Sequence, residues 1–382
     1  MTQSDVVVVG LGSVGSMALW HLSRQGHSVV GVEQFGRVHA AGAYAGESRL
    51  FRVAAKEGAL YTPALLRARE LWLELAEASG RDVLLPVGAL HLAPGDHEDL
   101  GATLRSAKDY DLPHEVLDAE ALRRRYPQFH VDDGDVGVLD LLGGAMRPET
   151  AVLAAQEQAL RHGASIVADA EVTAIEATDA GVIVRTADHE FHARRAIVTA
   201  GPWTARVLPE LRDLLSVASF TLTWLMPRHP EWFTPDRFPG FMRDLTVPGA
   251  SDVHAFGVPT LDGFSIKICP HIVLPEVADV RDRATEVSPE TLRWAGEQAQ
   301  RMIPDLVPEP VRWSVHPDSQ SPDKAPVIDT VADGRIVVAA GMSGNGFKFI
   351  PVYGLAVAEL ATTGSSVWQH ERFTLFAHRS IG

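Results

Sequence analysis

The chain has 382 residues, of which 46% are hydrophobic and 22% are charged, and it contains one cysteine. Its formal net charge of −15 disfavours nucleic acid and anionic membranes as partners, because like charges repel. A single cysteine excludes an intramolecular disulfide and a cysteine-rich metal site. The length predicts roughly two or three domains. The sequence contains no basic-then-apolar leader and no apolar run of about 18 residues, so we expect a cytoplasmic protein without a membrane span.

The N-terminal segment predicts a β-α-β unit within about 30 residues. The β-branched run at 6–9 is typical of a buried parallel strand. A helix is predicted over 16–24, with its apolar side chains on one face, and a second strand over 27–33. The order strand, helix, strand indicates a nucleotide-binding fold.

The turn between the first strand and the helix carries a glycine motif. Gly10, Gly12 and Gly15 form G-x-G-x-x-G, which permits the tight turn, the approach of a pyrophosphate and close helix–strand packing. Glu33 ends the second strand, where a carboxylate accepts hydrogen bonds from ribose hydroxyls and repels a 2′-phosphate. The motif therefore predicts FAD or NAD and disfavours NADP. The neighbours expected to line this site are Ser13, Val14 and Gln34.

The remaining elements predict a mixed α/β chain. Helices are expected over 63–78, 119–125, 148–162, 289–302 and 352–362, and strands over 165–167, 171–177, 181–186, 196–200 and 336–340. The segment 219–272 is rich in strand-forming and aromatic residues. Because nucleotide-type elements occur at the start, the middle and the end, we expect two interleaved domains rather than two consecutive ones.

Three further segments carry a resemblance. The early loop 39–52, the turn Thr199-Ala-Gly-Pro-Trp203 and the late loop 340–349 occur in the order and spacing of the sarcosine oxidase and N-methyltryptophan oxidase family. The chain resembles that family along nearly its whole length. The resemblance implies FAD as cofactor, a secondary amino acid as substrate, and oxygen reduced to hydrogen peroxide. The family lies within the D-amino-acid oxidase and glycine oxidase class.

The resemblance also implies a fold and its division. We expect a Rossmann-like FAD-binding domain interleaved with a strand-rich α+β substrate domain. The first would comprise 1–84, 145–218 and 318–382, and the second 85–144 and 219–317. The family is often monomeric, so a monomer or small homo-oligomer is expected.

Site roles follow from the same resemblance. Arg52 and Lys348 would hold the substrate carboxylate, Lys267 would lie over the flavin to activate oxygen, and His271 matches an active-site histidine. Gly344 would bring the backbone close to flavin and substrate. The other residues expected to contact the cofactor are Ser48, Arg49, Val172, Ala200, Gly201, Trp203, Gly341, Asn345, Gly346 and Phe347, together with Lys348.

The chain departs from the family at the point of covalent flavin attachment. His316 occupies the position of the family's cysteine, while Cys269 lies on the strand of Lys267 and His271. We therefore expect FAD to be bound non-covalently, and a histidyl linkage through His316 is the alternative. Cys269 is expected to be an inert small residue or a site of inhibition.

The expected substrate pocket also departs from the family. Phe256 and Asp318 each replace a tyrosine, and Ala45 replaces a histidine. These changes remove hydroxyls and ring volume and add a carboxylate. They predict a substrate larger than sarcosine, such as an N-carboxymethyl amino acid cleaved to a primary amine and glyoxylate.

Simpler interpretations exist for several residues. Arg49 and Arg52, three apart, would share one face of a helix as surface charges, and Lys267 would point to solvent from a one-sided sheet. His189 and His192 lack metal-ligand spacing and fall in an expected hairpin, and we expect no metal site. Rival functions are a flavin dehydrogenase using another acceptor, an NAD-dependent dehydrogenase, and a catalytically silent FAD-binding protein.

Overall fold

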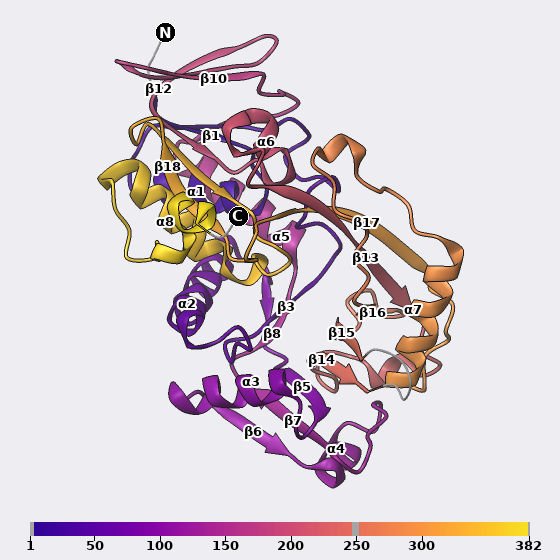
Figure 1. Ribbon diagram of the computed structural model, residues 1–382. Coiled ribbons are helices and arrows are strands. Elements are labelled where there is room, and N and C mark those ends of the chain that lie inside the picture. Colours follow the sequence, from indigo (N-terminus) through magenta and orange to yellow (C-terminus); the bar gives the residue numbers. More distant parts are fainter. Residues whose placement is uncertain (1–3, 247–251, 381–382) are drawn as a thin grey trace.

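A computed structural model describes residues 4–246 and 252–380. Two eight-stranded sheets form its framework, and a small three-stranded sheet lies between them (Figure 1). The helices are α1 (Ser13–Arg24), α2 (Thr62–Ser79), α3 (Glu98–Asp109), α4 (Ala119–Arg125), α5 (Pro148–Arg161), α6 (Thr204–Val207), α7 (Pro289–Met302), α8 (Ile350–Thr363) and α9 (Leu375–Arg379). None of the described helices is long and apolar enough to cross a membrane.

The first sheet has a parallel centre with antiparallel strands joined to it. Its strands are β1 (Ser4–Val9), β2 (Val29–Val32), β9 (Ser165–Val167), β10 (Ala174–Thr178), β11 (Gly181–Arg185), β12 (Glu190–Val198), β18 (Val327–Val331) and β19 (Ile336–Ala340). Strand β1 pairs in parallel with β2 and β12, and β12 pairs in parallel with β19. The carboxyl ends of these strands therefore meet at one edge of the sheet.

Side chains of β1 alternate between two cores, as the period of a strand requires. Val6 and Val8 pack with helices α1, α2, α5 and α8, while Val7 and Val9 pack on the opposite face with β11 and β12. All four valines are buried. This two-sided burial explains the uninterrupted apolar run in the sequence.

The second sheet supplies the other wall of the molecule. Its order is β17 (Arg312–Gln320), β13 (Ser216–Leu225), β16 (Ile266–Pro270), β15 (Val253–Val258), β14 (Gly240–Leu245), β5 (Ala89–Pro94), β7 (Asp135–Asp140) and β6 (His114–Leu117). The small sheet contains β3 (Arg49–Phe51), β8 (Gly144–Met146) and β4 (Leu84–Leu85). In Figure 1 the second sheet extends away from the helices that cover the first.

The predicted α/β class is confirmed, and most elements lie where the sequence places them. Helix α1 begins at Ser13 instead of 16, because the glycine turn ends at Gly12. Strand β12 begins at Glu190 and so includes half of the expected hairpin. Three of the described helices, α3, α6 and α9, were not predicted. The buried residues of α3 are Leu100, Thr103, Ser106 and Ala107, of which only Leu100 is a large apolar side chain.

Candidate active site

A cavity of about 870 Å³ lies between the carboxyl edge of the first sheet and one face of the second. Residues from both sheets and from the loops that follow their strands line it. Those that the sequence had singled out are Gly10, Gly12, Ser13, Val14, Glu33, Gln34, Arg49, Arg52, Val172, Ala200, Gly201, Trp203, Phe256, His271, Asp318, Gly341, Gly344, Asn345, Gly346, Phe347 and Lys348. The fold thus brings together residues more than 300 positions apart.

The glycine turn forms one end of the cavity, and its backbone requires glycine. Gly10 has a φ of 87°, in the left-handed region. A Cβ on Gly15 would lie 1.9 Å from the Gly10 carbonyl oxygen, so only glycine permits this packing. Gly12 caps helix α1 with no side-chain hydrogen bond. The helix therefore presents backbone N–H groups and the positive end of its dipole to the cavity.

Glu33 lies beside this turn. Its Oε2 accepts from the backbone N–H of Leu11 at 2.7 Å, and its Oε1 accepts from Phe35 at 3.0 Å. An ionised carboxylate offers about four acceptor positions, so two lone pairs remain for ribose hydroxyls. The carboxylate is buried and held by the backbone, which fixes its direction.

The loop 43–48 is held by two cations. The Arg49 guanidinium donates to the carbonyls of Ala43, Ala45 and Ser48 at 2.7–2.8 Å. Lys267 donates to the carbonyl of Ser48 at 2.6 Å and to that of Gly46 at 3.0 Å. Arg49 and Lys267 thus bind the carbonyl groups of this loop and fix its path along the cavity.

Lys267 is only 2% exposed, so the interpretation of a solvent-facing lysine is wrong. Burial and then the neighbouring Arg49 lower the pKa of Lys267 to about 7, because both penalise its charged form. Its Nζ lies 5.7 Å from the ring centre of Trp224 and 6.0 Å from that of Phe256. The surface-helix interpretation of Arg49 and Arg52 is also wrong, because Arg49 begins strand β3 and Arg52 follows its end.

Arg52 and Lys348 converge on a residue that the sequence did not indicate, Glu57. Its Oε1 accepts from Arg52 Nη2 at 2.6 Å and from Lys348 Nζ at 3.2 Å. Burial opposes the charge of Glu57, but Arg52 and Lys348 hold its pKa well below the usual range. Burial lowers the pKa of Lys348 to about 8, and Glu57 partly offsets this. No spacing rule connects a glutamate after β3 with a lysine near the C-terminus.

This group retains unused hydrogen-bonding capacity. Arg52 Nη1 and Glu57 Oε2 are buried, and neither has a hydrogen-bond partner among the described residues. A buried guanidinium N–H without an acceptor is costly. An anion in the cavity would satisfy Arg52 Nη1 while Lys348 remains close by.

The late loop is anchored by Asp318. Its Oδ2 accepts from the backbone N–H of Gly344 and, at 3.2 Å, from Gln320 Nε2. Burial raises the pKa of Asp318 to about 6, although the Gly344 N–H opposes that rise. Asp318 therefore lines the cavity and also supports the loop that carries Lys348.

The second sheet contributes an apolar and aromatic wall. Met242, Phe256 and Cys269 line the cavity from neighbouring strands, where Phe256 pairs with both of the others. His254 and His271 continue this wall, with ring centres 6.3 Å apart. Cys269 is buried, and burial raises the pKa of its thiol. A protonated, buried thiol is unreactive.

Five residues singled out by the sequence lie behind the cavity lining rather than on it. They are Gly15, Ala45, Ser48, Lys267 and His316. The Ala45 carbonyl accepts a hydrogen bond from Arg49. His316 Nε2 lies 2.8 Å from Ser314 Oγ. Burial, followed by Arg49, lowers the pKa of His316 to about 4.

The residues of the cavity fit a flavin dinucleotide. The free helix N-terminus suits a pyrophosphate, Glu33 suits a ribose, and the cavity continues past the glycine turn to the second sheet. A nicotinamide or flavin ring would be enclosed by Arg49, Phe256 and the late loop.

These features define the class of protein as a dinucleotide-binding oxidoreductase with a two-sheet cavity. Residues 5–360 match the family model described as FAD dependent oxidoreductase, named DAO. The chain belongs to this family. It is therefore an FAD-dependent oxidoreductase, and the expectation of FAD rather than NAD is confirmed.

Similar proteins agree with this assignment. Monomeric sarcosine oxidase of Streptomyces avermitilis is 33% identical over 371 residues, covering 95% of this chain and 94% of that protein. N-methyl-L-tryptophan oxidase of Yersinia pestis is 32% identical over 381 residues, covering 98% and 99%. Among solved structures, NikD, an amino acid oxidase, has a TM-score of 0.85 at 22% identity, covering 98% of both chains. Glycine oxidase from Geobacillus kaustophilus has a TM-score of 0.80 at 21% identity, covering 98% and 99%.

Proposed function

We propose that this protein oxidises an N-substituted glycine larger than sarcosine, with oxygen as the electron acceptor. The products would be a primary amine, glyoxylate and hydrogen peroxide, with one water consumed. The observation that carries the proposal is the pair of buried cations, Arg52 and Lys348, at the substrate end of a flavin-type cavity. The full-length similarity to amino acid oxidases supports it.

Arg52 and Lys348 would bind the substrate carboxylate. Arg52 Nη1 has no competing partner among the described residues and is buried, so a carboxylate there gains charge-assisted hydrogen bonds. Fixing the carboxylate orients the carbon between it and the nitrogen, which is a proximity effect. Glu57 would hold both cations in place and reduce their combined charge by one.

The bound FAD would supply the redox chemistry, taking a hydride from that carbon and passing two electrons to oxygen. Lys267, which lies behind the cavity lining, would act on the bound flavin through its side-chain charge rather than by contact. With a pKa of about 7, Lys267 exchanges its proton near neutral pH. Its two carbonyl acceptors hold Nζ at a fixed position. An ammonium there would stabilise negative charge that develops on reduced oxygen.

A non-covalent flavin is part of the proposal. His316 does not line the cavity, its Nε2 lies within hydrogen-bond distance of Ser314 Oγ, and its ring is tilted against that of Phe220. Acid precipitation of the purified protein should therefore release the flavin into the supernatant. Flavin retained in the pellet would support the histidyl linkage instead.

A large substrate arm is supported by the wall of the second sheet. Phe256, Met242 and His271 line the cavity without a tyrosine hydroxyl. The hydrogen bond from Gly344 to Asp318 gives that carboxyl a role in the late loop. We therefore place the enlarged arm against the Phe256 side of the cavity, with Asp318 supporting the loop above the flavin.

The proposal is tested by peroxide release from a panel of amines. The panel contains sarcosine, glycine, N-methyltryptophan and N-carboxymethyl amino acids of increasing chain length. We expect kcat/KM to rise with the size of the nitrogen substituent. A preference for sarcosine would retain the oxidase and reject the enlarged pocket. Flavin bleached by a substrate under nitrogen, without peroxide in air, would favour a dehydrogenase using another acceptor.

A further inference from the structure

A chain of buried hydrogen bonds runs through the second sheet and ends at the cavity wall. Thr103 Oγ1 in α3 lies 2.9 Å from His91 Nδ1 in β5. His91 Nε2 lies 2.8 Å from Asp244 Oδ2 in β14, and Asp244 Oδ1 lies 2.6 Å from His254 Nδ1 in β15. Thr103, His91 and Asp244 are buried, whereas the His254 side chain is 25% exposed and lines the cavity.

The network fixes a proton on the nitrogen of each histidine that faces Asp244. The hydrogen bonds from His254 and His91 hold the pKa of Asp244 well below its usual range, although burial opposes this. An ionised carboxylate only accepts hydrogen bonds, so the histidine nitrogens facing it carry the protons. His254 therefore donates through Nδ1. Its other nitrogen, Nε2, has no hydrogen-bond partner among the described residues and is an acceptor when the ring is neutral.

The position of His254 places this free nitrogen at the substrate end. His254 and Phe256 are two residues apart on β15 and so share one face of the sheet. The backbone N–H of His271 donates to the His254 carbonyl at 2.8 Å, and the two rings are neighbours. His254 thus lies beside the residues against which the proposed substrate arm packs.

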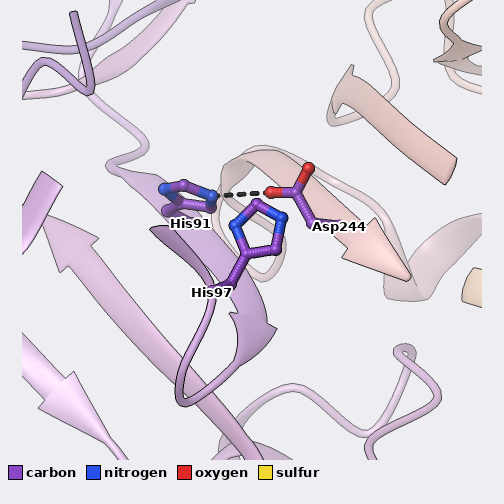
Figure 2. A group of neighbouring side chains, drawn as sticks. All are labelled: His91, His97 and Asp244. Atoms are coloured by element: carbon purple, nitrogen blue, oxygen red, sulfur yellow. Dashed lines mark hydrogen bonds and ion pairs between the residues drawn. The ribbon is translucent and has the colours of Figure 1, made fainter. Parts of the chain in front are cut away.

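The same cluster contains donors of a kind that zinc accepts. One atom each from His91, His97 and Asp244 lie within 4.8 Å of one another, and Figure 2 shows the His97 ring beside the bond between the other two. However, His91 and Asp244 already satisfy each other. Arg52 and Lys56 are near enough to His91 to oppose positive charge there. These contacts favour a hydrogen-bonding network over a metal site.

We propose that His254 is a specificity-determining residue whose Nε2 accepts a hydrogen bond from a donor on the substrate's nitrogen substituent. Asp244 and His91 are positioning residues that fix its ring and tautomer. The substrate class is an N-substituted glycine whose arm ends in a hydroxyl or an N–H group. This inference rests on the proposed function and specifies the arm that the function leaves open.

Three N-substituted glycines with nitrogen substituents of similar size test the inference. They are N-(2-hydroxyethyl)glycine, N-propylglycine and N-(2-methoxyethyl)glycine, which offer a donor, no polar group, and an acceptor alone. We expect the holoenzyme to prefer the hydroxyethyl arm over propyl by about three- to tenfold in kcat/KM, the range of one hydrogen bond. The methoxyethyl arm should show no preference. Thioether analogues, with sulfur for the amine nitrogen, report the same ratio as a Kd from the flavin spectrum without turnover.

Variants of His254 and Asp244 test whether their hydrogen bonds cause the preference for the hydroxyethyl arm. His254→Leu should reduce the hydroxyethyl-to-propyl ratio to about one, and His254→Phe provides a second variant that keeps a ring without nitrogen. Asp244→Asn should reduce the ratio while the substrate carboxylate still binds. His229→Leu is the matched control, because His229 makes the same Nδ1–carboxylate contact with Asp305 at 2.7 Å and does not line the cavity.

The outcomes separate the two proposals. Turnover without any arm preference, or a preference that survives in His254→Leu, would overturn the role of His254 and leave the oxidase intact. A preference for the methoxyethyl arm would overturn it as well, because it requires a donating Nε2. Absence of both turnover and flavin bleaching with all three arms would reject the proposed function, and this inference with it.

Discussion

The two ends of the cavity are built by different means. The end formed by the first sheet consists of backbone: a glycine turn, an uncapped helix N-terminus and a carboxylate held by main-chain N–H groups. The other end consists of buried, charged side chains that come from several elements, and some of their partners lie far away in the sequence. Backbone sites depend on local spacing, whereas side-chain sites depend on the completed fold.

The largest effect should come from the backbone end. A Cβ on Gly15 would meet the Gly10 carbonyl oxygen at 1.9 Å and Thr199 Oγ1 at 2.5 Å. Gly15→Ala should therefore yield insoluble or flavin-free protein, because rigid backbone cannot relieve the overlap. The ratio of flavin absorbance to protein absorbance after purification measures this loss.

Gly12→Ala is the matched control for that variant. Its Cβ would meet only the Tyr44 ring, at 3.9 Å, an ordinary contact. The flavin-free protein should melt at the wild-type temperature and yet bind FAD at least tenfold more weakly, since the added methyl group blocks the approach of the pyrophosphate. Equal melting of the two flavin-free variants would contradict the packing role of Gly15.

At the side-chain end, Arg52→Ala should reduce kcat/KM by about a hundredfold. Charge-assisted hydrogen bonds contribute roughly 1.5–3 kcal/mol each, and the variant also leaves Glu57 with one cation fewer. The flavin content should stay at the wild-type level. Steady-state kinetics with the preferred amine measures the effect, and loss of flavin in this variant would argue that the two ends are not separate.

The pH dependence of substrate binding should reveal Lys348. Its folded pKa is about 8, so the ammonium loses its proton as the pH rises through that value, and the KM should increase by about tenfold above it. Lys348→Arg keeps its charge throughout this range, so the rise should disappear. A rise that persists in Lys348→Arg would assign the titration to another group.

The smallest effect is expected for Glu57→Gln. The substitution removes a negative charge that shares both cations with the substrate, so the KM for an anionic substrate should fall by about two- to fivefold. A KM that rises instead would show that Glu57 favours substrate binding, because holding the two cations in position matters more than its competition with the substrate for them.

The comparison also explains what could be predicted from the sequence. The glycine spacing, the strand valines and Glu33 are local patterns, so β1, α1 and β2 lie close to where the sequence predicts them. Glu57 and His254 were not predicted, because each belongs to a group that only the fold completes: Glu57 binds Lys348, and the Asp244 that contacts His254 is held by His91 from a distant strand. Helix α3 was missed because three of its four buried residues are small or polar. Arg52, Lys348 and Lys267 were indicated by resemblance alone.

The register of the first sheet has a consequence for synthesis of the protein. Strand β1 leaves the ribosome well before its neighbour β12, which ends at Val198, and before β19, which ends at Ala340. The loop that carries Lys348 follows β19 directly. A nascent chain therefore cannot enclose FAD until β19 and the loop after it have been translated, and its early strands remain without their final partners in the meantime. The availability of chaperones and of FAD should therefore set the yield of active protein while the first sheet is still incomplete.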